Sequence, residues 1–253
     1  KRSDGYHDLS TCFYPVPWTD MVEVVKADKF SFTATGLPIP GDTQHNLCVK
    51  AYELLAVDFQ LDPVAIHLHK IVPMGAGLGG GSANGAHTLR LLNELFDLKL
   101  TAEVLCQYAL TLGSDCAFFI HDKPLLGSGR GEILSPATVS LSGKFLVIIK
   151  PDIHIATREA YAGVTPAMPS IDLEKLLAQH DISEWKGKLI NDFEASVFTR
   201  HPAIAAIKNF LYAQGALYAS MSGSGAAVFG IFEKPIASAD WFPEAVQWCG
   251  QLP

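Results

Sequence analysis

One stretch constrains this chain more than any other, the ten residues Pro-Met-Gly-Ala-Gly-Leu-Gly-Gly-Gly-Ser from Pro73 to Ser82. Five of the seven positions from Gly75 to Gly81 are glycine, so the backbone can adopt positive φ and turn its N–H groups toward one point. Apolar residues after the loop repeat at helical spacing and predict a helix, with Ser82 as its N-cap. Because free N–H groups and the helix dipole point the same way, this pattern predicts a site for a multiply charged anion.

Two common phosphate-loop patterns do not fit this stretch. The P-loop requires a lysine directly before its final Ser or Thr, and here Gly81 precedes Ser82. The dinucleotide pattern G-x-G-x-x-G is formally met, but the preceding residues 65–70 alternate apolar and polar side chains. That alternation predicts a half-exposed antiparallel strand, whereas a dinucleotide-binding unit needs a buried parallel one. A flexible linker or a plain tight turn is disfavoured because a patterned helix follows at once.

Composition excludes several classes of protein. At 253 residues, with 49% hydrophobic and 18% charged residues, the chain can bury the core of one large or two small domains. A net charge of −7 without a basic run longer than two residues argues against nucleic acid as a main partner. No apolar run approaches the ~18 residues of a membrane span. The five scattered cysteines predict reduced thiols and a cytoplasmic location, and Cys116 is interpreted as a buried structural thiol. The oligomeric state is left open.

Further candidate residues stand at predicted element ends. The Asp-Gly turn signal at residues 4–5 puts Tyr6 and His7 just before a strand. Asn46 is a predicted helix cap, and Thr101 starts a helix that ends at Gly113. Lys70, judged on local sequence alone, is an edge-strand lysine. Further along, residues 145–149 predict a buried strand, residues 204–217 a helix, and residues 221–232 a small-residue turn that leads into a buried strand.

Together these motifs resemble the GHMP kinase superfamily over nearly the whole chain, from Asp4 to Phe232. The glycine loop is similar to the second motif of that family, which wraps the phosphates of ATP. Residues 221–232 are similar to the third motif, which closes over the phosphates from the other domain. The resemblance implies an α+β fold with two domains, 1–144 and 145–253, and an active site in the cleft between them. It also implies ATP and Mg²⁺, the latter without a dedicated set of protein ligands.

The resemblance also assigns roles to residues. It implies that Asp115, in a Gly-Ser-Asp run ahead of two phenylalanines, is the catalytic base. It implies that Tyr6, His7, Thr157 and Tyr161 bind the substrate, with the Tyr161 ring stacked on a cytosine from the side opposite Tyr6. Nucleotide-binding residues are implied at Asn46, Leu47, Lys70, Pro73, Gly75, Gly77, Leu78, Gly79, Gly80, Gly81, Ser82, Ser222, Gly223, Ser224 and Gly225.

Gly-Tyr-His at residues 5–7, Asp115 and Tyr161 narrow the resemblance to kinases of a small molecule, a cytidine diphosphate-linked sugar alcohol, in isoprenoid synthesis. Two alternatives stay open: a GHMP kinase for another alcohol of the homoserine or mevalonate type, and a non-catalytic nucleotide-binding relative. Local structural roles also stay open, such as a turn or cap at Asp115 and a helix start at residues 191–194.

The chain departs from the family at two places. The first family motif, a strand with Pro-Ala-Lys, would precede Lys1, so we expect a missing beginning and poor activity of the chain as written. The family commonly has two serines at the end of the glycine loop, whereas here Ala83 follows Ser82. Only a minor hydroxyl contact is put in doubt by that change.

Overall fold

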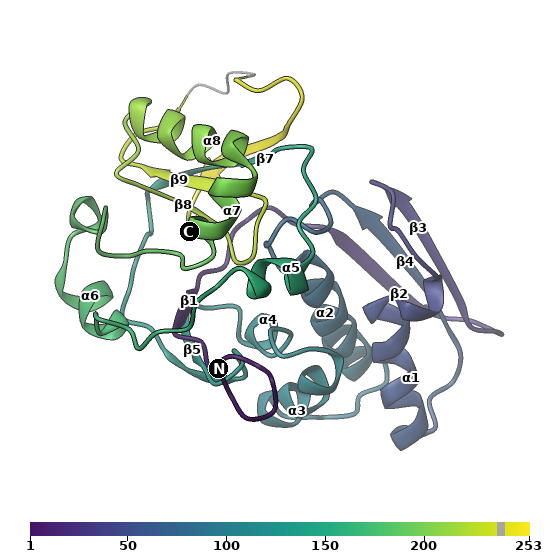
Figure 1. Ribbon diagram of the computed structural model, residues 1–253. Coiled ribbons are helices and arrows are strands. Elements are labelled where there is room, and N and C mark those ends of the chain that lie inside the picture. The colour runs from purple at the N-terminus through teal and green to yellow at the C-terminus, as the bar shows by residue number, and fades with distance from the viewer. Residues whose placement is uncertain (237–240) are drawn as a thin grey trace.

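The structure is a computed structural model that describes residues 1–236 and 241–253, so residues 237–240 of the predicted C-terminal domain lie outside the described residues. Its described part contains three sheets with helices packed against them, an α+β architecture as predicted (Figure 1). None of the helices in this described part has the length and apolar character needed to span a membrane.

The sheet that leads into the glycine loop has the order β2-β4-β3, with bounds Met21–Lys26 (β2), Val64–Lys70 (β4) and Ser31–Gly36 (β3). The central strand β4 is antiparallel to β2, as predicted, but parallel to β3. The crossover from β3 to β4 consists of a short 3₁₀ turn and a helix, η1 (Thr43–His45) and α1 (Leu47–Phe59). Alternate β4 residues are buried, which points one face of the sheet at the helices.

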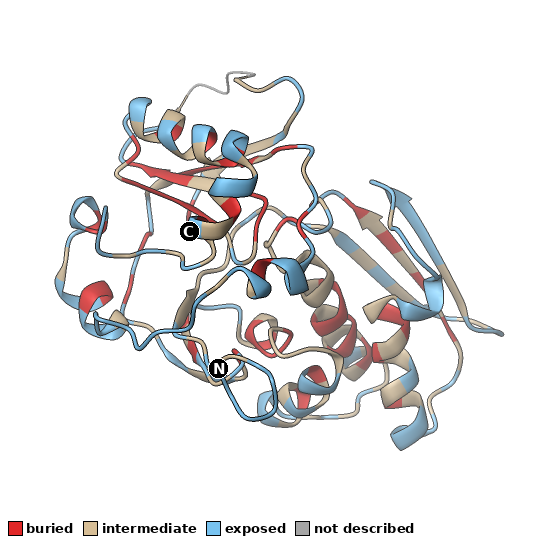
Figure 2. Ribbon diagram, in the orientation of Figure 1, coloured by how far each residue is buried: buried red, intermediate tan, exposed pale blue. Residues whose placement is uncertain are grey.

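Helices α1, α2 (Gly80–Leu95), α3 (Ala102–Leu112) and α4 (Phe118–His121) contribute buried residues to the core on that side, and α2 contacts β2. Apolar residues of these helices and of β4 form one core, and Figure 2 shows buried residues along both α2 and β4. The predicted caps are confirmed: the Asn46 side chain accepts from Cys48 N, and the Thr101 side chain accepts from Val104 N.

A small antiparallel sheet has the order β1-β5-β6, with bounds Thr11–Phe13, Leu125–Ser128 and Ile133–Pro136. Residues 129–132 form the hairpin turn between β5 and β6. The predicted boundary between residues 144 and 145 lies just past this sheet, directly before the first strand of the next one, and it stays a prediction.

The largest sheet is antiparallel with the order β10-β7-β9-β8, and its strands are Val246–Gln251 (β10), Phe145–Lys150 (β7), Val228–Phe232 (β9) and Tyr218–Met221 (β8). It is accompanied by α5 (Thr157–Ala162), α6 (Leu173–Gln179), η2 (Ile182–Glu184), α7 (Glu194–Arg200) and α8 (Pro202–Ala213). The prediction of a buried strand at 145–149 is confirmed. The predicted helix 204–217 is wrong at its end, because Gly215 has φ +92 and stops the helix.

Candidate active site

The glycine loop takes the conformation that its composition predicts. Gly75, Gly77 and Gly79 have φ of +62, +74 and +67, and α2 begins at the next residue, Gly80. The prediction of Ser82 as N-cap is therefore wrong: the positive φ of Gly79 makes that residue the N-cap, three positions earlier. Ser82 lies instead in the first turn of α2, where its hydroxyl is available to a partner outside the helix.

That partner is Asp115. The Ser82 hydroxyl donates to Oδ1 of Asp115 at 3.0 Å. Asp115 is half-buried in the turn between α3 and α4, and a Cβ on Gly79 would lie 3.8 Å from its other oxygen. The two helices that flank it do not use this carboxylate as a cap, because the C-cap of α3 is Gly113 and the N-cap of α4 is Ala117, which makes no side-chain bond. The structure thus brings the predicted base to the first turn of the predicted phosphate-binding helix.

The second small-residue turn, residues 222–225 between β8 and β9, lies against the glycine loop. The Ser222 hydroxyl donates to the Gly77 carbonyl at 2.7 Å, and Ala227 N donates to the Ala76 carbonyl at 3.1 Å. A Cβ on Gly77 would lie only 2.0 Å from the Ser222 carbonyl oxygen, so glycine is required there. Two turns that are 145 residues apart in sequence therefore meet as one backbone-lined surface.

Beneath the loop lies a buried polar cluster that the sequence did not indicate. Lys70 and Asp20 form an ion pair whose side chains are 1% and 2% exposed. Asp20 also accepts from Ile71 N at 2.7 Å, Val72 N at 2.8 Å and the Asn84 amide at 3.0 Å. Burial raises the pKa of the Asp20 carboxyl, but hydrogen bonds from Lys70, the two backbone N–H groups and Asn84 more than offset it and lower that pKa.

This cluster corrects the local interpretation of Lys70. The residue belongs to the central strand rather than an edge, and its ammonium pairs with Asp20, the carboxylate that accepts from the backbone N–H groups of Ile71 and Val72 ahead of the loop. Its contact with a nucleotide stays a prediction, as do those of Asn46, Leu47, Pro73 and Leu78. Leu47 does contact α2, because a Cβ on Gly85 would lie 2.9 Å from the Leu47 Cβ.

The predicted substrate-binding aromatics are only partly brought together. The His7 ring stacks on Tyr161 with centroids 5.1 Å apart, and Phe193 meets Tyr161 edge-on at 4.9 Å. Tyr6 is 57% exposed, and its ring lies under the Arg130 guanidinium at 5.0 Å. His7 rather than Tyr6 therefore faces Tyr161 in this structure. Thr157, the exposed first residue of α5, starts the helix that carries Tyr161.

Two residues beside the site were missed by sequence reasoning. A Cβ on Gly75 would lie 3.1 Å from Nδ1 of His154, so this imidazole lies against the loop. The Arg130 guanidinium lies over the Tyr6 ring from the turn between β5 and β6. Neither contact has a local signal, since both partners are distant in sequence. The interpretation of Cys116 is confirmed: it is fully buried, and burial together with Asp115 raises the pKa of its thiol to about 12.

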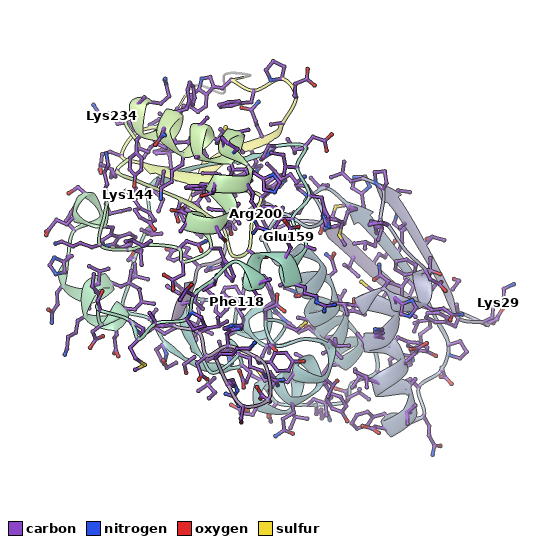
Figure 3. All side chains as sticks on the ribbon, in the orientation of Figure 1. Lys29, Phe118, Lys144, Glu159, Arg200 and Lys234 are labelled. Carbon is purple, nitrogen blue, oxygen red and sulfur yellow. The ribbon has the colours of Figure 1, made fainter. Side chains whose placement is uncertain are left out.

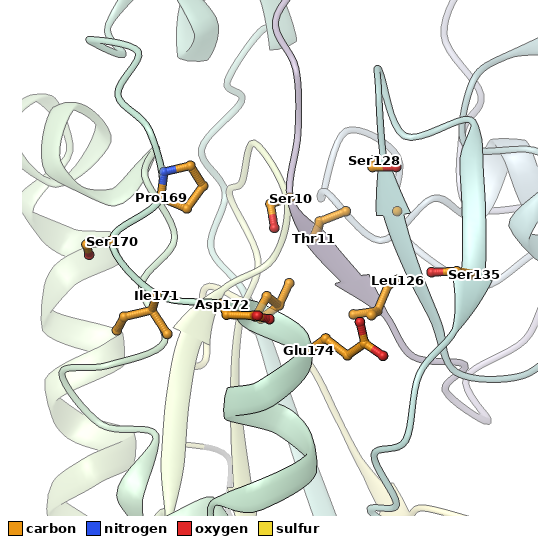
Figure 4. Close-up of a pocket in the computed structure, with 12 residues that line it drawn as sticks. Ser10, Thr11, Leu126, Ser128, Ser135, Pro169, Ser170, Ile171, Asp172 and Glu174 are labelled. Carbon is orange, nitrogen blue, oxygen red and sulfur yellow. The ribbon is translucent and has the colours of Figure 1, made fainter.

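Two cavities in the described part of the chain lie away from the predicted site residues, apart from a contact at Pro73. An open cavity of about 460 Å³ lies between the β1-β5-β6 sheet and residues 169–174, and none of the predicted site residues lines it (Figure 4). A second, of about 300 Å³, touches the glycine loop only at Pro73. Within the described residues, no group of three or more His, Cys, Asp or Glu side chains could hold a metal ion.

Comparisons with known proteins agree with the motifs. Residues 46–123 match the model of the GHMP kinase N-terminal domain, and residues 173–240 match that of the GHMP kinase C-terminal domain. Proteins named 4-diphosphocytidyl-2-C-methyl-D-erythritol kinase are similar along most of this chain. The one from Cytophaga hutchinsonii is 51% identical over 93% of this chain and 87% of its own length. The one from Bacteroides fragilis strain YCH46 is 49% identical over 95% and 90%.

Solved structures give the same result. The crystal structure of a 4-(cytidine 5'-diphospho)-2C-methyl-D-erythritol kinase matches with a TM-score of 0.75 and 30% identity, over 92% of this chain and 84% of that one. A homoserine kinase from Cytophaga hutchinsonii matches with a TM-score of 0.65 at 20% identity, over 84% and 76%, and so shows the fold alone. This chain therefore belongs to the GHMP kinases, which are ATP-dependent phosphotransferases, and within them to the 4-diphosphocytidyl-2-C-methyl-D-erythritol kinase family.

Proposed function

We propose that this protein transfers the γ-phosphoryl group of ATP to the 2-hydroxyl of 4-diphosphocytidyl-2-C-methyl-D-erythritol, a step of non-mevalonate isoprenoid synthesis. The observation that carries the proposal is the position of Asp115, hydrogen-bonded to Ser82 at the start of α2 and beside the glycine loop. A proton acceptor next to an anion-binding helix terminus is what phosphoryl transfer to an alcohol requires.

The nucleotide phosphates would lie against the free N–H groups of the loop and of the first turn of α2. These groups and the dipole of α2 favour negative charge at that point, and the turn at residues 222–225 approaches the same place from the other sheet. Phosphoryl transfer has a loose transition state with charge spread over phosphate oxygens, so positioned donors supply most of the catalysis.

Mg²⁺ fits this site as a partner of the nucleotide. It prefers oxygen ligands and usually binds through one or two protein oxygens together with substrate phosphates and waters. The Ser82 hydroxyl and the Asp115 carboxylate, 3.0 Å apart, are donors of that kind. Bound there, the ion would neutralise charge on the phosphate oxygens; the protein residues hold the reactants and move the proton.

Asp115 would accept the proton of the attacking hydroxyl. The Ser82 hydroxyl bonds one carboxylate oxygen, so the other stays available to the substrate. Phe119, whose ring lies where a Cβ of Gly79 would be, supplies an apolar wall beside the carboxylate. This arrangement holds the base in one orientation toward the loop.

The cytidine would be held by the aromatic group at Tyr161. The ring of Tyr161, which stacks on His7 and stands nearly perpendicular to Phe193, would supply the aromatic face that a base ring needs for stacking. Stacking contributes about 1–3 kcal/mol per base. Because the cytidine is remote from the reacting hydroxyl, that binding energy orients the alcohol for attack.

The test is a comparison of alcohols at saturating ATP and Mg²⁺, with ADP release as the readout. We expect turnover with 4-diphosphocytidyl-2-C-methyl-D-erythritol to exceed that with homoserine or mevalonate by at least ~10³ in kcat/KM, about 4 kcal/mol. Comparable turnover of mevalonate or homoserine would overturn the substrate assignment. Binding of ATP without turnover of any alcohol would overturn the enzymatic assignment.

A further inference from the structure

The segment Asn191 to Glu194 lies between the two halves of the proposed site. It begins beside β8, the edge strand of the largest sheet, and it ends as the first residue of α7. An edge strand leaves backbone groups without a strand partner. Here the side chains of this segment bond those groups, at the point where β8 becomes the phosphate-facing turn.

Asn191 holds the turn directly. Its amide donates to the Met221 carbonyl at 2.7 Å and to the Gly223 carbonyl at 2.8 Å, the residues on either side of Ser222. Its oxygen accepts from Phe193 N at 3.0 Å, which fixes the orientation of the amide. Both amide hydrogens are therefore used to set the path of the backbone on both sides of Ser222.

Glu194 holds the end of β8. Its buried carboxylate accepts from Met221 N at 2.8 Å and from the Ser220 hydroxyl at 3.0 Å, and Lys208 of α8 neutralises it. An N–H bond to a carboxylate is among the stronger hydrogen bonds in proteins. With Asn191, this carboxylate leaves the turn little freedom to move independently of the segment.

Phe193, between these two residues, belongs to the substrate half. Its ring packs nearly perpendicular to that of Tyr161 at 4.9 Å, and Tyr161 also stacks on His7. The helix that carries Tyr161 is also tied to α7, because Arg200 donates to Glu159 at 2.7 Å; Figure 3 labels this pair beside α5. A displacement of Tyr161 is thus transmitted to the segment that fixes the backbone around Ser222.

We propose that residues 191–194 couple the two halves of the site, so that a nucleoside diphosphate bound at Tyr161 favours binding of the nucleotide triphosphate at the turn, and the reverse. This coupling rests on the proposed function, because it requires a cytidine group at Tyr161. Asn191, Phe193 and Glu194 are positioning residues in this scheme. The effect is a difference of binding free energies and is therefore reciprocal.

The test is calorimetric titration of the whole chain with a non-hydrolysable ATP analogue and Mg²⁺, with and without saturating CDP. In the unaltered protein we expect CDP to lower the Kd of the analogue about fivefold or more. The substitution Phe193→Leu keeps the hydrogen bonds of Asn191 and Glu194 but removes the aromatic ring that contacts Tyr161. In this variant the coupling ratio, defined as the Kd of the analogue without CDP divided by its Kd with CDP, should lie within about twofold of one. The Kd of the analogue alone should stay within about twofold of its value in the unaltered protein.

Asn191→Asp is a nearly isosteric second variant. It replaces the two donated bonds by a charge facing two carbonyl oxygens, so the Kd of the analogue alone should rise at least tenfold and that of CDP alone less than threefold. Matched controls are Asn209→Asp, exposed on α8, and Phe59→Leu, at the end of α1. Both control variants should have the same coupling ratio as the unaltered protein, and thermal unfolding reports whether each variant is folded.

A coupling ratio of one in the unaltered protein would overturn the proposed coupling. So would a coupling ratio in Phe193→Leu that equals that of the unaltered protein. If the unaltered protein binds the analogue but not CDP, the substrate assignment is overturned and the coupling with it. In that case the Asn191→Asp titration with the analogue alone still decides whether Asn191 positions the turn, so the two failures are distinguishable.

Discussion

At the residue scale, the proposed chemistry depends on Asp115, whose environment is simple. One oxygen accepts from Ser82, and the carboxylate lies next to the glycine loop rather than at a helix end. Local sequence left a cap or turn role open for it. The cap role is excluded because Ala117 is the N-cap of α4, and the hydrogen bond from Ser82, 33 positions earlier, cannot be inferred from spacing alone.

Asp115→Asn keeps the shape of the side chain but removes its ability to accept a proton. We expect kcat to fall by ~10²–10⁴, the usual effect of losing a general base, with both KM values within a few-fold. Steady-state kinetics at saturating ATP and thermal unfolding measure the two effects side by side. A near-normal kcat would exclude Asp115 as the base and leave phosphate positioning alone.

Tyr161→Ala tests the substrate side. Removing one stacked ring should raise the KM for the cytidine substrate by about 5- to 150-fold, the equivalent of 1–3 kcal/mol, and leave the KM for ATP nearly unchanged. The control is Tyr108→Ala, a half-buried tyrosine of α3 whose hydroxyl donates to Asp58 rather than to any predicted site residue. A rise confined to the KM for ATP would move Tyr161 to the nucleotide side.

Asp20 makes stability depend on pH. Its pKa is lowered in the folded state, so the stabilisation is fully present above the unfolded carboxyl pKa of about 3.9 and is lost as pH falls through the lower folded value. The urea concentration at the midpoint of unfolding should stay constant from pH 7 to 5, and it should decrease once the pH is below about 4.

Asp20→Asn should have a lower free energy of unfolding at pH 7, since breaking a buried ion pair costs about 3–5 kcal/mol. On acidification, its free energy of unfolding should decrease by less than that of the unaltered protein. Asp28→Asn, an exposed residue after β2, is the control. Identical acid profiles for Asp20→Asn and the unaltered protein would show that Asp20 contributes no such linkage.

At the element scale, the parts that local pattern decides were predicted well. The alternation of β4, the caps of α1 and α3 and the buried run of β7 all follow from period or capping chemistry. The start of α2 was wrong because five glycines offer several residues that can take positive φ, and only the fold selects Gly79. The short strands β8 and β10 have no pattern of their own and form by pairing with β9 and β7.

Gly81→Ala separates the anion-binding role of α2 from its structural role. A Cβ on Gly81 meets no heavy atom within 4 Å, so alanine should raise the stability of the helix by up to about 1 kcal/mol. Because a helical Cβ tilts toward the N-terminus, the methyl group would occupy space next to the loop. We therefore expect a higher melting temperature together with a KM for ATP raised several-fold.

Gly85→Ala, one turn further along, provides the contrast. Its Cβ would lie 2.9 Å from that of Leu47 in the core, so it should lower the melting temperature. If Gly85→Ala weakened ATP binding and Gly81→Ala did not, the first turn of α2 would have a structural role in packing and no role in anion binding.

At the scale of the whole molecule, the proposed site lies where turns from two sheets meet. The glycine loop continues from β4, the facing turn joins β8 to β9, and Ala76 of the loop packs into the core against the largest sheet. Sequence indicated each turn separately. Their hydrogen bonds to each other, the Lys70–Asp20 pair and the bonds of Asn191 join residues 30 to 145 positions apart, so only the folded chain reveals them.

The most direct measurement of the central claim is proton-coupled ³¹P NMR of the reaction product. The 2-carbon of the proposed substrate bears a methyl group and no hydrogen, so a phosphate on its oxygen has no proton three bonds away. The account predicts one new monoester resonance without three-bond splitting, formed in equal amount with ADP from ATP and 4-diphosphocytidyl-2-C-methyl-D-erythritol. A doublet or triplet, which marks transfer to a secondary or primary hydroxyl, or no monoester resonance at all, would contradict it.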